Sequence, residues 1–566
     1  MQRPSLFTRD PATLFSALPG PLRERLGIGS CGVRNLLDMA GRGLDAPHNA
    51  ALGAVYADML FSALGESPLN GELAGRILNI PELRELIEPD RAALLRSLAD
   101  AWQRPANLSY FQNLAARRDM AKLRGFLEGR ICAEPDNLFW REQALTLAIS
   151  EGDPDFALAA LDSDVLRGLA PVHAAGRWQA FYMAGRHDEG ADLAQETEAL
   201  FGAGFAHARA AESALAGGGR GEGLCRLLAS LARSPWRVNE LLRASELLDG
   251  QDQETAPMRG QVCVLLYTWN KADDLDAALA ALARSDLGLA RIAALNNGST
   301  DHTARVLAKW QGEFGRDRMS VVELPVNVGA PAARNWLLHA EAKDADWLVY
   351  LDDDALVPRD WLGRLGAAVQ RLPEAGVWGC RVVDDAQPLL AQSADYHLTP
   401  PGAALADAPD LSRIEPHPFK LSNLQIQGLD RGQFNYVRPC ASVTGCCHLF
   451  RRDRLLEAGD FSLYLSPSQY DDMERDLRML AKGRLAAYQG HLRVRHRKRT
   501  GRSTLVPGQE NANALGNRYK MQVLHGAEEI AEATRKDAEA VLADLQARME
   551  RVRPALEEQC ATDQDS

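Results

Sequence analysis

The sequence predicts an α/β fold for the C-terminal half of the chain, with a mostly parallel central sheet, preceded by an all-α domain. Two observations support this division. Residues 1–250 are rich in Ala, Leu, Arg and Glu, and their apolar residues recur at spacings of three and four, the period of an amphipathic helix. From residue 261 onward, short β-type runs alternate with helical runs, which is typical of a parallel sheet covered by helices.

The composition is that of an ordinary globular protein. The 566 residues are 46% hydrophobic and 25% charged, and no apolar run is long enough to be a transmembrane segment. The formal net charge of −12 argues against a nucleic-acid partner. The N-terminus lacks the apolar core of a secretory signal, and the nine Cys form no C-x-x-C pair. We therefore expect reduced thiols and a cytoplasmic location. Within the cytoplasm, the protein would be either free or peripheral at the inner face of the membrane.

A weak repeat marks residues 135–250 of the helical half. Gly152, Gly185 and Gly218 stand 33 residues apart, and each lies between two helical stretches with a small residue five positions later. This pattern resembles the helix-turn-helix unit of tetratricopeptide-like repeats, whose small residues let paired helices approach closely. The Trp and Tyr positions of that motif are absent, so an irregular helical domain is the alternative. In either case, we expect this domain to offer a surface for a protein partner or acceptor.

Three further boundaries complete the predicted organisation. Residues 251–260 are polar and contain Pro and Gly, which predicts a linker. Residues 261–525 form the predicted α/β domain. Residues 526–566 are charged and helical, and we interpret them as a C-terminal helix that ends in a frayed polar tail.

Polar motifs follow the first four predicted strands. They are TWNK at 268–271, NNGSTD at 296–301, NVG with ARN at 327–335, and the Asp triplet at 352–354. Ligands of parallel sheets bind at the carboxyl ends of the strands, so these motifs should lie together. The NNGSTD turn could merely cap the following helix. Three consecutive Asp with no neighbouring Lys or Arg call for a cation or for full solvation, and oxygen ligands suit Mg²⁺ or Mn²⁺.

Taken in this order, the four motifs resemble the donor half of family 2 glycosyltransferases, enzymes of the GT-A fold. An acceptor half follows: VTGCCHLFRRDRLLEAGDF at 443–461 resembles the family's G-x-x-x-x-x-R-R strand, and QYDDMERDLRMLAKG at 469–483 resembles its E-D-x-D-x-x-x-R helix. The resemblance covers about 260–525. It departs at Asn296, where the family usually has Asp, and at Asp471, where the family has Glu.

The resemblance implies an inverting glycosyltransferase of the hexosyltransferase type. Its donor would be a nucleotide-diphosphate sugar, with a UDP-sugar expected, and transfer to a hydroxyl would occur by single displacement. The acceptor would be a surface polysaccharide, a lipid-linked glycan or a protein. The alternative is a non-catalytic helical scaffold with a nucleotide-sugar-binding domain.

The resemblance also assigns site residues. Asp472 matches the catalytic base; its alternative role, shared with Asp471, is N-capping and compensation of the helix dipole. Asp354, Asp352 and His496 are the expected ligands of a divalent metal, Mn²⁺ or Mg²⁺; for His496, a place in a solvated basic loop at 491–502 is the alternative. The expected donor-binding residues are Thr268, Asn270, Asn297, Ser299, Asp301, Arg334, Asp352 and Asp353.

A zinc site at Cys446, Cys447 and His448 is not expected from the sequence. These residues lie in a strand-like segment, whose alternation would send the two cysteines to opposite faces. No fourth ligand is evident beside them.

Overall fold

The computed structural model describes residues 10–45, 50–399, 419–426, 428–497 and 508–565. These residues form two compact units. The helical unit contains the described residues of 1–249, 424–434 and 545–566, and the sheet unit contains those of 250–423 and 435–544. Residues 498–502 of the predicted basic loop lie outside the described part of the chain.

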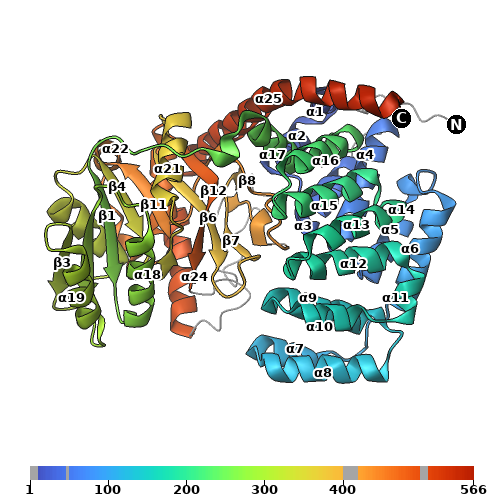
Figure 1. Ribbon diagram of the computed structural model, residues 1–566, viewed down its shortest axis with the longest axis horizontal. Coiled ribbons are helices and arrows are strands. Elements are labelled where there is room, and N and C mark those ends of the chain that lie inside the picture. Colours follow the sequence, from blue (N-terminus) through green and yellow to red (C-terminus); the bar gives the residue numbers. More distant parts are fainter. Residues whose placement is uncertain (1–9, 46–49, 400–418, 427, 498–507, 566) are drawn as a thin grey trace. The chain divides into compact units, whose positions relative to one another are not determined.

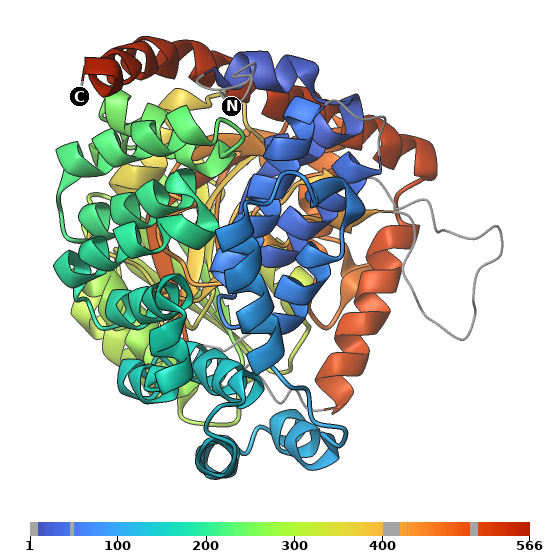
Figure 2. The same cartoon turned by 90° about the vertical axis from the view of Figure 1, so that its right-hand side faces the viewer.

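The helical unit is built from helices, most of which pack against a neighbour in sequence (Figures 1 and 2). Their bounds are α1 Pro11–Ala17, α2 Gly20–Ile28, α3 Val33–Leu44, α4 Ala50–Glu66, α5 Gly71–Leu78, α6 Pro89–Ala101, α7 Ser109–Arg117, α8 Met120–Ala133, α9 Leu138–Glu151, α10 Pro154–Leu161, α11 Asp164–Gly168, α12 Ala170–Met183, α13 His187–Glu196, α14 Glu198–Phe201, α15 Ala203–Ala216, α16 Arg220–Arg233 and α17 Val238–Asp249.

The three repeat glycines occupy equivalent turns. Gly152, Gly185 and Gly218 all have positive φ, at 68°, 71° and 87°, and they lie between α9 and α10, α12 and α13, and α15 and α16. A left-handed residue is the usual way to end a helix before a tight turn, and Gly adopts it without strain. The small residue five positions later is buried in the second helix of each pair; at Gly223, an added Cβ would collide with the side chain of Leu215. The 33-residue spacing is thus the separation in sequence between the turns of successive helix pairs.

Two segments distant in sequence complete the helical unit. Arg431 is buried between Glu66 and Glu212, at 2.9 and 3.2 Å, and Asn239 Nδ2 donates to the carbonyl of Gln433 at 2.9 Å. At the C-terminus, Arg548 is buried and lies 2.7 Å from Glu246. The expected boundaries at 261–525 and 526–566 follow local composition. These two segments instead belong to the helical unit, because their arginines pair with buried carboxylates far away in the sequence.

The sheet unit contains one large mixed sheet in the order β10-β12-β6-β11-β4-β1-β2-β3, with β5 paired to β12 and β7 to β6 (Figure 1). Strands β1 to β4 are parallel, and β11 is antiparallel to β4 and β6. The strands are β1 Val262–Thr268, β2 Arg291–Asn297, β3 Met319–Leu324, β4 Trp347–Leu351, β5 Ala355–Leu356, β6 Val377–Asp384, β7 Ala391–Ser393, β8 Leu398–Thr399, β9 Lys420–Leu421, β10 Val437–Cys440, β11 Cys447–Arg451 and β12 Ala486–His496.

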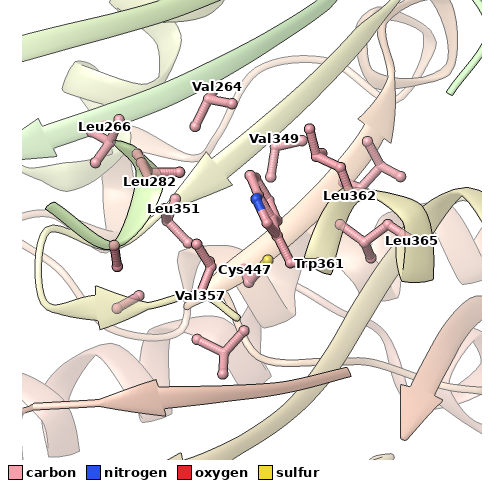
Figure 3. Close-up of a cluster of buried hydrophobic side chains, with 14 of the residues drawn as sticks. Val264, Leu266, Leu282, Val349, Leu351, Val357, Trp361, Leu362, Leu365 and Cys447 are labelled. Carbon is pink, nitrogen blue, oxygen red and sulfur yellow. The ribbon is translucent and has the colours of Figure 1, made fainter. Parts of the chain in front are cut away.

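Helices pack on this sheet, among them α18 Ala272–Arg284, α19 Thr303–Phe314, α20 Ala330–Trp336, α21 Trp361–Arg371 and α22 Arg452–Glu457. The unit also contains α23 Asp471–Ala481, α24 Gly508–Val523 and the part of α25 Ala527–Asp565 up to residue 544. Alternate strand residues such as Val264 and Val349 pack with Trp361 in a buried core (Figure 3). On the opposite face, Tyr350 contacts Phe461 and donates to the carbonyl of Arg334. Because apolar side chains fill both faces of these strands, the polar motifs lie at the strand ends.

The predicted linker is bound to the sheet unit. Ala256 is buried, and its N–H donates to the carbonyl of Gly363 in α21 at 2.9 Å; Arg364 donates to the carbonyl of Asp252. At the other end of the unit, α25 continues to Asp565, where the sequence predicted a frayed tail. All nine cysteines are free thiols. Among the described residues, every helix is too short or too polar to cross a bilayer.

Candidate active site

The loops after β1 and β2 are joined by the residues predicted to bind the donor. Asn270 has a φ of +53°, and its Oδ1 accepts from the N–H of Thr300 at 2.7 Å. Its own N–H donates to Ser299 Oγ at 3.0 Å. Asp301 accepts from the N–H of Ala272 at 3.2 Å. Asn270, Ser299 and Asp301 therefore fix the shape of this edge.

Asn297 joins the second loop to the third. Its Oδ1 accepts from the N–H of Val328 and its Nδ2 donates to Asn327 Oδ1, both at 2.9 Å. Gly298 has a φ of +72°, and an added Cβ would lie 2.5 Å from the backbone of Val326, so only Gly fits between these loops. Thr268 is buried at the end of β1.

Two residues of the Asp triplet form ion pairs with a lysine that was not among the predicted site residues. Lys271 Nζ, from the loop after β1, lies 3.1 Å from Asp353 and 2.7 Å from Asp354. The premise that no Lys or Arg neighbours the triplet was wrong, because residues at the ends of adjacent parallel strands meet in space. Burial and the charge of Asp354 raise the pKa of Asp352 to about 6, and burial raises that of Asp353.

His496, the last residue of β12, faces the same carboxylates. Its Nε2 lies 2.9 Å from Asp354 Oδ1, and its Nδ1 lies 2.8 Å from Gln392 Oε1 on β7. Burial opposes ionisation of Asp354, but the hydrogen bond and charge of His496, with Lys271, hold the pKa of Asp354 below its usual range. Because Gln392 accepts the Nδ1 proton, the Nε2 atom is the one directed at the aspartates.

Arg334 links the donor half of the site to the acceptor half. It lies on α20 and is buried; its guanidinium is 2.5 Å from Asp471 on α23 and 3.9 Å from Asp352. The guanidinium also lies 5.3 Å from the ring centroids of Tyr267 and Phe461. Asp471 is thus an ion-pair partner within the site, and it makes no side-chain cap.

Asp472, the predicted base, is held by two backbone donors. Its Oδ2 accepts from the N–H of Gly445 at 2.7 Å, and its Oδ1 accepts from the N–H of Met473 at 2.9 Å. Four residues later, Asp476 accepts from the N–H of Val443 at 3.2 Å. Two carboxylates on one face of α23 therefore fix the loop before β11. A Cβ at Gly445 would lie 2.5 Å from Asp472 Oδ2, so this glycine sets the position of the carboxylate.

Within the described part of the chain, one group of side chains is close enough to hold a metal ion. Ligand atoms of Asp352, Cys446 and His496 all lie within 4.8 Å of one another, and the Asp354 carboxylate lies 2.9 Å from His496. Carboxylates and an imidazole fit Mn²⁺, which accepts both oxygen and nitrogen ligands. The structure therefore places His496 beside both Asp352 and Asp354, and adds Cys446, which was not among the predicted ligands.

Three further residues of the site were also missed. Lys271 had a visible signal, because it ends the same motif as Asn270. Gln392 and Gly445 had none, because their roles depend on contacts with His496 and Asp472 that only the fold creates.

Comparisons with known proteins agree with the fold. Residues 263–456, about a third of the chain, match the profile of glycosyl transferase family 2. The chain therefore carries a domain of this family, and its sheet unit has the GT-A fold predicted from the sequence. No curated protein matches the chain.

Solved structures give only a distant likeness. One is GalNAc-T7 with UDP, GalNAc and Mn²⁺, at 14% identity and a TM-score of 0.35, covering 48% of this chain and 50% of that one. A second is the mannosyltransferase PcManGT of Pyrobaculum calidifontis with GDP-Man and Mn²⁺, at 16% identity and a TM-score of 0.32, covering 60% and 91%. A third is S. aureus TarS 1–349 with UDP-GlcNAc, at 14% identity and a TM-score of 0.31, covering 51% and 72%. This chain thus spans half the length of the first of these proteins.

Proposed function

We propose that this protein is an inverting, metal-dependent glycosyltransferase that moves a hexosyl group from a UDP-sugar to an acceptor hydroxyl. The observation that carries the proposal is the continuous cluster from Asp352 through Arg334 to Asp471. It joins the carboxyl ends of the strands to the first turn of α23, where Asp472 lies. A donor and an acceptor would meet between these elements.

The donor side would be formed by the loops after β1, β2 and β4. Asn297 and Asp301 would bind the nucleoside through the loops that they stabilise, and Asp352 would face the ribose. Arg334 Nε is buried without a hydrogen-bond partner among the described residues, so a donor oxygen could satisfy it. These contacts would hold the sugar with one face open to attack.

Asp472 would take the proton of the acceptor hydroxyl as that oxygen attacks the anomeric carbon. The N–H groups of Gly445 and Met473 hold its two oxygens, and this fixed orientation is what a positioned base requires. A single displacement of this kind inverts the anomeric centre.

Asp352, Asp354 and His496 would hold a divalent metal, with Mn²⁺ favoured by the mixed oxygen and nitrogen donors. When bound, the metal would supply Lewis-acid stabilisation of the leaving diphosphate. The helical unit would bind a protein acceptor or a protein partner, as stacked helix pairs do in repeat proteins.

A second candidate function is a non-catalytic scaffold that binds nucleotide sugar. The observation in its favour is Lys271, which forms ion pairs with both Asp353 and Asp354 without a metal. A site that no longer used a metal would need such a cation.

The test is release of nucleoside diphosphate from a panel of UDP- and GDP-sugars, measured with Mn²⁺, Mg²⁺ or EDTA. We expect hydrolysis of one donor that depends on the metal and is lost in Asp354→Ala. Donor binding without hydrolysis under every condition would favour the scaffold. Full hydrolysis in EDTA would refute the metal assignment.

A further inference from the structure

Cys446 lies at the divalent site because of strand register. β11 pairs antiparallel with β4, with Cys447 opposite Leu351, so the preceding residue Cys446 stands opposite Asp352. The N–H of Asp352 donates to the carbonyl of Cys446 at 3.0 Å, which fixes this pair. The Cys446 Sγ, an oxygen of Asp352 and a ring nitrogen of His496 lie within 4.8 Å of one another.

The neighbouring residues face elsewhere. Cys447 packs in the hydrophobic core with Trp361 (Figure 3), Cys446 is buried at the border of the same core cluster, and His448 lies 2.9 Å from the carbonyl of Val443. The possible metal-binding partners of Cys446 come from the ends of β4 and β12 and not from its own segment. A sulfur, a nitrogen and an oxygen ligand converge from three strand ends.

We propose that Cys446 is a ligand of the divalent site, which makes it a mixed sulfur, nitrogen and oxygen site able to bind Zn²⁺ or Co²⁺ in addition to Mn²⁺. The inference deepens the proposed function, because it concerns the same site. Thiolate ligands favour Zn²⁺ over Mn²⁺, and mixed sulfur, nitrogen and oxygen donors are common in zinc sites.

Binding has a defined proton balance. A cysteine thiol has an ordinary pKa of about 8.5 and carries its proton at neutral pH. The thiol is therefore protonated without a metal. Coordination forms a metal–sulfur bond and breaks the S–H bond, and the proton passes to solvent. Each ion bound through sulfur should release one proton more than an ion bound through the other ligands alone.

The decisive experiment uses Co²⁺ with the full-length protein. We expect a thiolate-to-Co²⁺ charge-transfer band in the near ultraviolet, removed by Zn²⁺ and absent in Cys446→Ser. Cys225→Ser is the matched control, since Cys225 is exposed in the helical unit, and it should retain the band. The preference for Zn²⁺ over Mn²⁺ should fall in Cys446→Ser by more than the roughly 10–100-fold that loss of an outer partner costs.

A band that persists in Cys446→Ser, bound Co²⁺ without a band, or no binding of Co²⁺ would each overturn the inference. Proton release in weak buffer, compared between wild type and Cys446→Ala, gives a second measurement, and thermal unfolding of both variants checks that they are folded. Nucleotide-sugar hydrolysis is measured separately with Mn²⁺. Its absence beside an intact band would count against the proposed function and leave the thiolate ligand standing.

Discussion

Asp472 can be tested as a base separately from its structural role. Asn has nearly the same shape and keeps one carbonyl oxygen for the N–H of Gly445, so Asp472→Asn should lower the free energy of unfolding by only about 1 kcal/mol. It removes the proton acceptor, so transfer should fall by about 10²–10⁴-fold while donor affinity is unchanged. Steady-state kinetics and calorimetric titration of the donor check this.

Asp460→Asn is the matched control for that variant, because Asp460 is half-exposed and lies beyond the site. It should transfer at the wild-type rate. If Asp472→Asn also does so, Asp472 is only a structural carboxylate.

Gly445 gives an independent test of the same group. Ala at this position would bring a Cβ to 2.5 Å from Asp472 Oδ2 and displace the carboxylate. A misplacement of about 1 Å can cost about 10²-fold in rate, so kcat should fall in Gly445→Ala while donor affinity is kept. Unchanged kcat would mean that the carboxylate position is not critical.

At this scale, the sequence could mark only those candidate residues that belong to motifs. Asp472 and Asp352 could be located because each lies in a recognisable motif. Lys271 also ends a motif, but its contact with Asp354 spans 83 positions, and the pairing of Arg334 with Asp471 spans 137. The motifs therefore indicate which strand ends meet, whereas the individual ion pairs depend on the fold.

Among the elements, the packing of the linker on α21 depends on one glycine. An added Cβ at Gly366 would collide with the carbonyl of Ala256, which is backbone and cannot rotate away. Gly366→Ala should therefore lower the free energy of unfolding by about 1–3 kcal/mol. Gly312, in α19, has open space around it, so Gly312→Ala should raise stability by up to about 1 kcal/mol. Urea denaturation of both variants measures these changes. Equal changes in the free energy of unfolding would contradict the close contact at Gly366.

A buried histidine should make stability depend on pH. His397 lies 3.0 Å from Asp395 and 3.1 Å from Asp537 of α25, and Arg438 is 3.7 Å from Asp395. Burial lowers the pKa of His397, but Asp537 and Asp395 outweigh it, so the pKa is raised. The imidazolium then stabilises the fold below its unfolded pKa, about 6.5, and this contribution is lost as pH rises through the folded value.

We expect the free energy of unfolding to fall between about pH 6 and about pH 8 by an amount that His397→Gln abolishes. Urea titrations across this range, taken as the difference between wild type and variant, remove the effect of other histidines. The pKa of Asp395 is lowered, so this carboxyl group titrates below the pH range of the experiment and does not contribute to the change. If the free energy of unfolding of the wild type, relative to that of His397→Gln, rose with pH, the pKa of His397 would not be raised and the ion pair would be refuted.

The long elements could be predicted because their periodicity is local. Strands β1 to β4 and the helices between them lie where the apolar runs place them. Strands such as β8 and β9 have two residues each, too few to show any alternation. Their pairing is set by partners in space.

At the scale of the whole molecule, the chain passes between the two units at 249, 423, 434 and 544. A fragment ending at residue 249 would lack Arg431 and Arg548, and would leave Glu212 and Glu246 buried with fewer cations. Removing one partner of a buried pair typically costs about 3–5 kcal/mol. We therefore expect fragment 1–249 to unfold without a cooperative transition in calorimetry, whereas the full chain shows one. A sharp transition at an unchanged temperature would mean that the N-terminal helices form a complete core.

The insertion of Arg431 between Glu66 and Glu212 also affects how the protein folds during its synthesis. The helices up to Asp249 leave the ribosome first, with Arg209 as one partner of both carboxylates, but the second cation is encoded roughly 180 residues later. At roughly 5–20 residues per second, the nascent helices would wait about 10–40 s for it. During that interval they would expose an incomplete interior, so this half of the protein should be a substrate for ribosome-associated chaperones, and translation pauses before residue 431 should lower its yield.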